Sequence, residues 1–486
     1  MNRQIRTLAV GCFVLFALLL INVNYVQVFQ AGDLNDRNTN KRARDAECSR
    51  ERGPIMVGDE TIVRSDPSND SLKFLRTYTD PALYAPVTGY FSCTYGTSGI
   101  ENSQNSVLSG SDERLFVSRV IDMVGNEQPK GGSVLLTLNP KAQRAALDGL
   151  EALPGDTRGA AVAIDPETGA ILAMVSTPTY DPNELAAHDL DAVTRAWERL
   201  TSEGGDTRFL NRAAQEIYPP GSTFKLVVAA AALSNGYSPN SRVKGGTALD
   251  LPQTPLTLRN ENNGNCGGAE ITLTRALAIS CNVAFGDLGL KLGAETLQEQ
   301  AELFGFNEDY LDEIPIADSV FPSDIDEPQT AFSSIGQFDV AATPLQMAMV
   351  TAGIANDGAV MRPYLVQEVR TPDAELLEEA DPEVLQQAIS SSVADDLTQM
   401  MVEVVENGTG GQARIDGIAV AGKTGTANSS PDQPPYAWMV TFAPADDPQV
   451  AVAVMIEQTG VPRDQITGGG LAGPIAADIM RAVIGR

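Results

Sequence analysis

Two groups of strand-like segments, far apart in the chain, constrain the fold more than any other feature. Residues 159–175 contain two apolar runs that flank Asp165-Pro-Glu-Thr-Gly169, so we expect a strand, a turn and a second strand. Three more strand-like runs lie near the C-terminus, over residues 418–423, 437–443 and 450–456. Helices are expected between and after these strands, over residues 226–233, over 391–406 and from Gly473 to the end. The sequence therefore predicts a mixed α/β fold in which an antiparallel sheet joins strands from both groups and is flanked by helices.

The N-terminal segment predicts a membrane anchor. Leu8 to Val28 is almost entirely apolar, and about 20 apolar residues span a bilayer as a helix. A cleaved signal peptide is the alternative, but no Ala-x-Ala sequence follows the apolar core. Basic residues lie before the segment and also after it, at Arg37, Lys41, Arg42 and Arg44. Because such charges do not decide whether a long domain is translocated, the orientation must be inferred from the chemistry of the body.

The change in composition along the chain predicts three parts. Residues 1–30 form the N-terminal tip and the transmembrane helix. Residues 31–145 are polar and rich in turn sequences, which indicates a small, irregular N-terminal domain that serves as a pedestal. Residues 146–486 contain the apolar strands and helices, so they form the main domain.

Charge and histidine content exclude several classes of function. The net charge of −29 excludes a protein that binds nucleic-acid phosphates, which needs clustered Lys and Arg. The single histidine, His188, lacks the clustered partners of a metal site or a Ser-His-Asp triad, so we assign it a structural role. We therefore expect no metal and no cofactor, and any nucleophilic chemistry must use another base.

The five cysteines suggest disulfide bonds rather than a metal site, because no Cys-x-x-Cys pair exists. Cys12 lies in the apolar segment, which leaves an even number of four. If the body is exported, two disulfides are expected, and the pairing to test first is Cys48 with Cys93 and Cys266 with Cys281. Four free thiols remain the alternative.

Three short motifs occur in order along the main domain. They are Ser222-Thr-Phe-Lys225, which follows a sharp Pro-Pro-Gly turn, then Ser280-Cys-Asn282, and then Lys423-Thr-Gly425, which Thr426 follows. Each motif is weak alone, because Ser-x-x-Lys recurs at Ser241 and Ser-x-Asn recurs at Ser103 and Ser238. A helix-capping serine and a surface lysine are the structural alternative for the first motif. The ordered set carries the inference.

The residue types in these motifs fit nucleophilic catalysis. A serine hydroxyl needs a base, and Lys225 lies one helical turn from Ser222. Burial and the positive charge of Lys423 would lower the pKa of Lys225, so that it can act as this base. Ser280 is the candidate proton relay, and Asn282 is the candidate group that holds a substrate amide. The Lys423-Thr424-Gly425-Thr426 segment offers a cation and two hydroxyls for a carboxylate. The backbone N–H groups of Ser222 and Thr426 are the expected oxyanion hole.

The chain resembles class B penicillin-binding proteins, most closely the penicillin-binding protein A type of actinobacteria. The ordered Ser-x-x-Lys, Ser-x-Asn and Lys-Thr-Gly motifs carry this resemblance. Further segments similar to the family are Arg52-Gly-Pro-Ile55, Ile164 to Val175, Tyr218 to Lys225, Ile335-Gly-Gln337 and Thr343 to Ala348. The family also starts its catalytic domain near Thr137 to Gln143, although Asn139 stands where Asp is usual.

The resemblance implies a D,D-transpeptidase that cross-links peptidoglycan stem peptides. Ser222 would be acylated by the D-Ala-D-Ala end of a stem peptide, and β-lactams would acylate the same serine. The resemblance also implies an extracytoplasmic body, a role in septal wall synthesis, and membrane partners that include a glycosyltransferase. A D,D-carboxypeptidase or β-lactamase-like hydrolase is one alternative, and a catalytically silent scaffold is another. A β-lactam sensor would need several membrane spans, and the sequence contains one candidate membrane-spanning segment.

Overall fold

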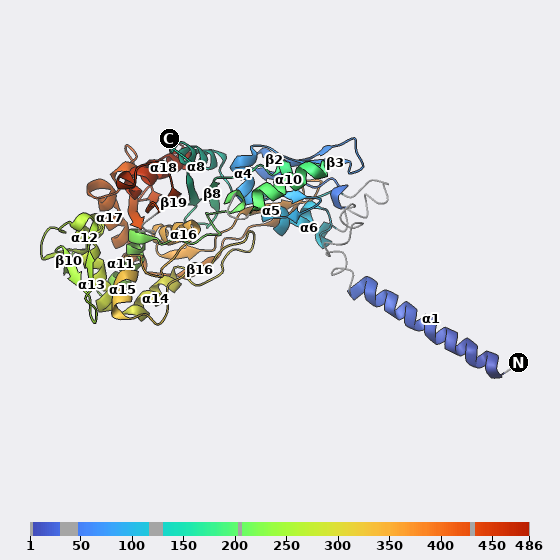
Figure 1. The fold of residues 1–486 in the computed structure, drawn as a ribbon, viewed down its shortest axis with the longest axis horizontal. Coiled ribbons are helices and arrows are strands. Elements are labelled where there is room, and N and C mark those ends of the chain that lie inside the picture. The colour runs from blue at the N-terminus through green and yellow to red at the C-terminus, as the bar shows by residue number, and fades with distance from the viewer. Residues whose placement is uncertain (1–2, 30–46, 116–129, 203–206, 428–432, 486) are drawn as a thin grey trace.

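The computed structural model describes residues 3–29, 47–115, 130–202, 207–427 and 433–485. Helix α1 (Arg3–Phe29) projects from one end of an elongated body, at the end opposite the main domain (Figure 1). Within the described residues, α1 contains the one helix long and apolar enough to cross a membrane, over Arg3–Val26. The basic residues that follow it in the sequence lie outside the described residues.

The main domain is built on a five-stranded antiparallel sheet, as predicted. Its strand order is β17 (Ala421–Ala427), β18 (Tyr436–Ala443), β19 (Val450–Gln458), β7 (Arg158–Ile164) and β8 (Ile171–Thr177). The early and late strand groups meet where β19 pairs with β7, with Ala451 opposite Ile164. The three central strands are buried on both faces, which explains why their sequences are continuous apolar runs.

Helices cover both faces of this sheet (Figure 1). On one face lie α8 (Pro140–Glu151) and α18 (Gly473–Ile484), which pack against each other. On the other face lie α16 (Pro344–Ala355) and α17 (Ser391–Asn407), with α11 (Lys225–Ser234) packed against α17. Local sequence sets where these helices begin. The Asn139 side chain accepts hydrogen bonds from the first turn of α8, so it caps the helix as an Asp would.

A helical lobe extends the main domain beside α11. It contains α12 (Leu273–Ala278), α13 (Asn282–Leu292), α14 (Ala294–Leu303) and α15 (Glu327–Ser333). Short strand pairs complete the lobe: β9 (Arg242–Lys244) with β12 (Glu270–Thr272), and β10 (Ala248–Asp250) with β11 (Thr257–Arg259). A further pair, β13 (Ala359–Met361) with β16 (Val384–Gln387), follows α16.

The N-terminal part is more regular than its turn-rich sequence suggested. It contributes β1 (Ile55–Val57), β2 (Glu60–Pro67), β3 (Phe74–Tyr78) and β6 (Ser133–Leu136) to a six-stranded sheet. The remaining two strands, β14 (Val366–Arg370) and β15 (Leu376–Glu379), come from far along the chain. Strand β14 pairs with β6, so the main domain supplies one edge of the pedestal sheet. Short elements surround this sheet: β4 (Phe91–Ser92), β5 (Gly96–Thr97), α4 (Pro81–Thr88), α5 (Gly99–Ser103), α6 (Asn105–Leu108), α9 (Asn183–Ala186) and α10 (Leu190–Thr201).

One predicted strand needs a correction. The apolar run at 418–423 was expected to form a strand that ends at Lys423, but β17 begins at Ala421 and continues through Ala427. Gly417 adopts a left-handed backbone (φ 75°), and Ile415 pairs with Ile418 in a tight turn, which delays the strand. The Lys-Thr-Gly motif therefore lies within the edge strand rather than after a strand.

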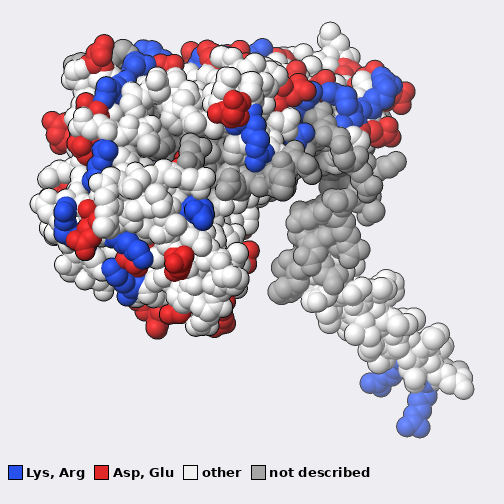
Figure 2. Space-filling model, turned by 60° about the vertical axis from the view of Figure 1, so that its left-hand side comes forward, with Lys and Arg blue, Asp and Glu red and all other residues white. Residues whose placement is uncertain are grey.

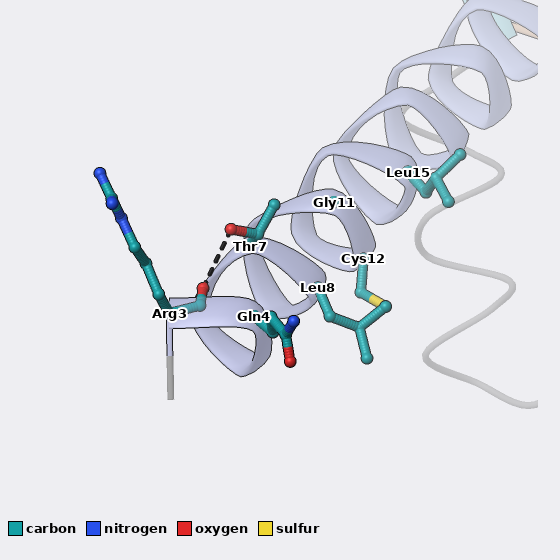
Figure 3. A pocket seen from close by; sticks show the side chains of 7 residues that line it. All are labelled: Arg3, Gln4, Thr7, Leu8, Gly11, Cys12 and Leu15. Carbon is teal, nitrogen blue, oxygen red and sulfur yellow. Dashed lines mark hydrogen bonds between the residues drawn. The ribbon is translucent and has the colours of Figure 1, made fainter. Parts of the chain in front are cut away.

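The surface separates the anchor from the body. Acidic and basic side chains are interspersed over the visible face of the body, whereas α1 carries charge only at its far end (Figure 2). Close to that end, Leu8, Cys12 and Leu15 lie along the exposed helix, and the Thr7 hydroxyl donates to the Arg3 carbonyl over 3.0 Å (Figure 3). An isolated helix with an exposed apolar surface is what a membrane-spanning segment presents.

Candidate active site

A cleft of about 610 Å³ lies between the edge strand β17, the start of α11 and the helical lobe. It is lined by residues from all three predicted motifs, namely Ser222, Ser280, Thr424 and Thr426. Segments outside the three motifs supply the rest of the lining: Asn260, Glu261, Gly264 to Gly267, Arg275, Ile279, Thr409, Gln412 and Thr467 to Gly470.

The first motif places a serine and a lysine in contact. A 3₁₀ turn (Gly221–Phe224) leads directly into α11, so Ser222 and Lys225 lie on one face of the helix start. The Lys225 Nζ lies 3.0 Å from the Ser222 Oγ. Lys225 is fully buried, whereas Ser222 is half-buried and open to the cleft. Gly221 adopts a left-handed backbone (φ 53°) and packs against Ala427, which leaves little room for a side chain.

The second motif joins the first through Lys225. Ser280 occupies the turn between α12 and α13 with a left-handed backbone (φ 58°), and Asn282 begins α13. The Lys225 Nζ donates to the Ser280 carbonyl over 2.8 Å and to the Asn282 Oδ1 over 2.7 Å, and it lies 3.2 Å from the Ser280 Oγ. The Asn282 side chain also donates to the Arg259 carbonyl. The motif is therefore held against the lysine by several polar contacts.

The third motif brings a second lysine to the same hydroxyl. The Lys423 Nζ donates to the Ser280 Oγ over 3.0 Å and to the Thr424 carbonyl over 2.8 Å. The hydroxyl of Ser280 thus bridges two lysines that are 198 positions apart in the sequence (423 minus 225). Both lysines are buried, so the site concentrates two basic groups away from bulk water.

The remaining residues of the third motif form the strand wall of the cleft. Thr424 shares a 2.6 Å hydroxyl contact with Thr409, and Thr426 is half-buried and lines the cleft beside Ser222. Gly425 lies between them, where a Cβ would meet the Pro220 carbonyl at 2.9 Å. Glycine is needed here because the strand backbone passes close to the turn that carries the serine.

Burial and charge tune both lysines. Desolvation, and then the positive charge of Lys423, hold the pKa of Lys225 well below its ordinary value. Desolvation lowers the pKa of Lys423 to about 7. The negative charge of Glu261 acts in the opposite direction on the pKa of both lysines, without overcoming burial. The lowered pKa shifts Lys225 towards the neutral amine, which is the form that accepts a proton.

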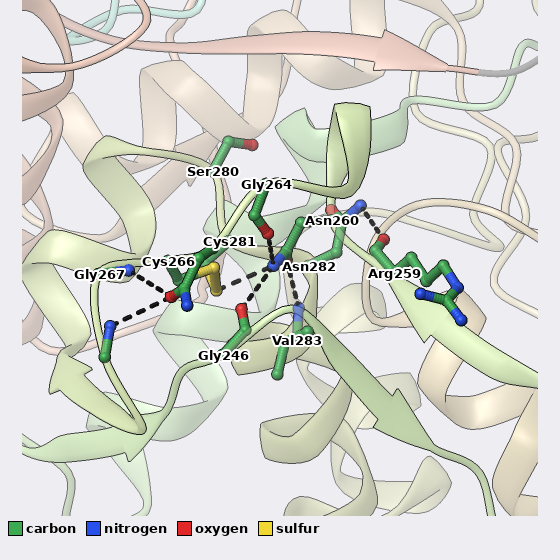
Figure 4. The surroundings of a disulfide bond; sticks show 12 residues. Gly246, Arg259, Asn260, Gly264, Cys266, Gly267, Ser280, Cys281, Asn282 and Val283 are labelled. Atoms are coloured by element: carbon green, nitrogen blue, oxygen red, sulfur yellow. Dashed lines mark hydrogen bonds between the residues drawn. A yellow bond between two sulfur atoms is a disulfide. The ribbon is translucent and has the colours of Figure 1, made fainter.

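A disulfide fixes one wall of the cleft to the second motif. Cys281, the central residue of that motif, is bonded to Cys266, and the loop around Asn260 and Gly264 surrounds this bond (Figure 4). The other expected bond, Cys48–Cys93, is also present in the N-terminal part. Both pairings expected from the sequence are therefore found.

The competing motif matches lie elsewhere. Ser241 contacts Ser238, and neither lines the cleft. Asn105, from the Ser-x-Asn match at Ser103, accepts a hydrogen bond from Arg52 in the N-terminal part. The histidine, His188, contacts Asp70 and lies 3.1 Å from the Phe74 carbonyl, which joins the α9–α10 connection to the pedestal sheet.

Comparison with known proteins identifies the family. Residues 159–481 match the penicillin-binding protein transpeptidase domain, and residues 52–134 match the penicillin-binding protein A dimerisation domain. The peptidoglycan D,D-transpeptidase PbpA of Mycolicibacterium smegmatis is 43% identical over 100% of this chain and 99% of its own length. Its counterpart from Mycobacterium tuberculosis is 39% identical with the same coverage.

A solved structure agrees with this assignment. Penicillin-binding protein A from M. tuberculosis, in its ceftriaxone acyl-enzyme complex, superposes with a TM-score of 0.87 at 39% identity. The superposition covers 90% of this chain and 100% of that one. The chain described above therefore belongs to the penicillin-binding protein transpeptidases, as a class B member of the penicillin-binding protein A type.

Proposed function

We propose that this protein is a peptidoglycan D,D-transpeptidase that works through an acyl-enzyme on Ser222. The observation that carries the proposal is the buried Lys225 amine, 3.0 Å from the Ser222 hydroxyl and with its pKa well below the ordinary value. An amine with a lowered pKa can accept the proton of the serine hydroxyl that it contacts, which activates the serine as a nucleophile. The activity of the mycobacterial relatives supports the same assignment.

The acylation half-reaction uses all three motifs. Lys225 accepts the Ser222 proton as the Ser222 Oγ bonds to the carbonyl carbon of the penultimate D-alanine. The C–N bond to the terminal D-alanine breaks, and the proton reaches the departing amine through Ser280, which contacts both lysines. The N–H groups of Ser222 and Thr426 stabilise the oxyanion. D-alanine leaves, and the rest of the stem peptide stays on Ser222 as an ester.

Substrate binding falls to the neighbouring residues. Asn282 holds a backbone amide of the stem peptide, and Lys423, Thr424 and Thr426 bind its terminal carboxylate. Gly425 allows the strand to approach the serine closely. A β-lactam carries a carboxylate beside its reactive amide, so it occupies the same positions and acylates Ser222. An amine from a second stem peptide then attacks the ester, which forms the cross-link and restores the serine.

The wider setting follows from the same assignment. We place residues 1–30 as the cytoplasmic tip and membrane anchor, 31–145 as the pedestal, and 146–486 as the extracytoplasmic transpeptidase domain. Two disulfides in the body support an oxidising, exported location. We assign the protein to septal wall synthesis, together with a glycosyltransferase and other membrane proteins of the division machinery.

The test is to incubate the full-length chain in detergent with a fluorescent penicillin and to map the label by peptide mass spectrometry. Ser222→Ala is the test variant. Ser241→Ala is the matched control, because it removes the serine of the other Ser-x-x-Lys sequence. We expect a long-lived adduct on Ser222 that is absent from Ser222→Ala and unchanged in Ser241→Ala.

Other outcomes favour other functions. Rapid loss of the adduct with turnover of the drug would favour a β-lactamase-like hydrolase. Release of D-alanine from a stem peptide without incorporation of an added amine would favour a carboxypeptidase. Folded protein that takes no label at all would contradict the proposal and favour a silent scaffold.

A further inference from the structure

Glu261 is one of two charged residues that line the cleft among the described residues, and it has no place in the reaction described so far. Glu261 begins a short 3₁₀ turn (Glu261–Asn263) that follows β11, and its exposed side chain lines the same cleft as Ser222. The two charged side chains of the lining are the carboxylate of Glu261 and the guanidinium of Arg275. Within the part of the chain that the structure describes, the Glu261 side chain makes no hydrogen bond and no ion pair.

The segment that bears Glu261 is held in place by its neighbour. The Asn260 side chain donates to the carbonyls of Gly246 and Gly264, each over 2.8 Å, and accepts from the Val283 N–H over 3.1 Å. These contacts tie the turn to the start of α13, close to the Cys266–Cys281 disulfide (Figure 4). The contacts of Asn260 therefore hold the backbone that carries Glu261 beside the cleft, as the support of a recognition group requires.

The charge of Glu261 reaches the reacting centre. It raises the pKa of both Lys225 and Lys423, in opposition to burial, although it forms an ion pair with neither. A carboxylate that lines the cleft and acts on the two buried amines also attracts a cation that enters the cleft. Glu261 does not serve to bind the donor peptide, because its carboxylate repels the terminal carboxylate of that peptide.

We infer that Glu261 binds the ammonium group of the acceptor and holds it in the cleft beside the Ser222 ester. The inference rests on the proposed function and deepens it, since it assigns a residue that selects a cationic acceptor. A carboxylate opposite an ammonium favours that acceptor over neutral water, and a like-charged acceptor would be disfavoured.

The second half-reaction transfers the acyl group from Ser222 to the acceptor nitrogen. The acceptor ammonium, paired with Glu261, loses one proton to the neutral Lys225 amine. Its nitrogen bonds to the acyl carbon, and the bond from that carbon to the Ser222 Oγ breaks. Lys225 returns a proton to the Ser222 Oγ, and the nitrogen loses its remaining extra proton to solvent. Glu261 takes no part in the proton transfers and acts by position and charge.

The experiment measures how one acyl-enzyme divides between an amine and water. A D-alanyl thioester acylates the full-length chain in detergent, and the acceptor concentration at which aminolysis equals hydrolysis is determined. Two acceptors are compared: D-alaninamide, which is largely an ammonium ion at neutral pH, and hydroxylamine, which is largely uncharged. This ratio does not depend on the rate of acylation, so it isolates the acceptor step.

Glu261→Gln is the test variant, and Glu270→Gln is its matched control. Glu270 is an exposed carboxylate on β12 that does not line the cleft, so the control removes the same charge from the same lobe. We expect Glu261→Gln to raise the required D-alaninamide concentration about fivefold, the effect of a partly screened charge pair. Hydroxylamine should show no matching change, and Glu270→Gln should behave as the native protein does.

The outcomes separate this inference from the proposed function. An unchanged D-alaninamide value in Glu261→Gln, with Ser222 still labelled by penicillin, would overturn the role of Glu261 and leave the transpeptidase intact. Equal changes for both acceptors would also overturn it, because Glu261 would then act through the lysines rather than on the acceptor charge. Absence of any Ser222 adduct in the native protein would overturn both the role of Glu261 and the proposed transpeptidase function.

Discussion

At the scale of single residues, the proposed chemistry depends on two lysines that are kept away from water. A lysine in solution is protonated at neutral pH and cannot take a proton from serine. Burial and the neighbouring charge of Lys423 lower the pKa of Lys225, which favours the neutral amine that can take this proton. The same burial lowers the pKa of Lys423 to about 7, so its charge responds to pH near neutrality.

Replacement of Lys225 tests its proposed role as the base. Lys225→Arg keeps a long cationic side chain, but a guanidinium stays protonated and cannot accept the Ser222 proton. We expect the rate of penicillin acylation to fall by about 10²- to 10⁴-fold, which is the usual contribution of a general base. Stopped-flow fluorescence with a labelled penicillin gives the rate, and circular dichroism checks the fold. Near-native acylation in a folded Lys225→Arg protein would rule Lys225 out as the base.

At the scale of elements, the Ser280-Cys281-Asn282 turn depends on contacts from outside its own helices. Its Ser280 backbone is left-handed, a conformation that non-glycine residues rarely adopt, and Lys225 contacts both of its polar side chains. The disulfide from Cys281 to Cys266 adds a covalent restraint over a sequence separation of 15. We infer that the bond serves the geometry of the site as well as stability.

The disulfides allow that inference to be tested. Joint replacement of Cys266 and Cys281 by alanine should lower the free energy of unfolding by about 3 kcal/mol, as expected for a loop of this length. It should also slow acylation by about ten- to a hundredfold, because small displacements of catalytic groups are costly. Urea unfolding and the labelled penicillin provide the two measurements.

The second disulfide provides the control for this prediction. Joint replacement of Cys48 and Cys93 removes a bond of the N-terminal part, so it should reduce stability and leave the acylation rate close to native. If both double variants slow acylation to the same degree, the Cys266–Cys281 bond has no special role at the site.

At the scale of the whole molecule, the pedestal and the main domain share one sheet. A buried cluster of charged side chains supports this sheet. Glu101 pairs with Arg52 at 2.7 Å and with Arg76 at 2.6 Å, and all three side chains are buried. These residues join α5, β3 and the segment before β1. Burial alone would raise the pKa of Glu101, but the two arginines outweigh it and hold that pKa below its usual value.

This cluster predicts how stability depends on pH. Because the pKa of Glu101 is lower in the folded chain, its contribution is present above the usual value of 4.5 and is lost as the pH falls through the lowered pKa. Glu101→Gln leaves two buried guanidinium groups poorly paired, so it should cost about 3–5 kcal/mol at neutral pH. The free energy of unfolding of Glu101→Gln should also fall less steeply with decreasing pH than that of the native protein.

The matched comparison is Asp66→Asn. Asp66 pairs with Arg64 at 2.9 Å on the exposed surface, so its removal should cost about 0–1 kcal/mol. Urea unfolding of the full-length chain from pH 7 to pH 3 measures both variants. Equal costs for the two substitutions would show that the buried cluster does not support the pedestal.

Local patterns in the sequence predicted much of this arrangement. Continuous apolar runs predicted the strands of the central sheet, since a strand buried on both faces must be apolar throughout. The Pro-Pro-Gly turn before an apolar helix predicted that Ser222 and Lys225 share one face, because a helix brings residues three apart together. Both disulfide pairings were also predicted, although spacing alone did not exclude other pairs.

Contacts between distant segments could not be predicted in the same way. The turn-rich pedestal sequence did not indicate a six-stranded sheet, because two of its strands come from residues 366–379. The site at Glu261 was not predicted either: a polar turn after a short strand resembles any surface loop until folding brings it to the cleft.

The sequence by itself determined the chemistry available to this protein: a serine, two lysines and their order along the chain. Helical and strand periodicity are local properties, so they can be deduced from neighbouring residues. Only the tertiary structure decided that Ser280 bridges Lys225 and Lys423, that both amines are buried, and that the Glu261 carboxylate lines the same cleft as Ser222. Burial and the distances between charges set the pKa values, and these depend on packing between segments that are far apart in the chain.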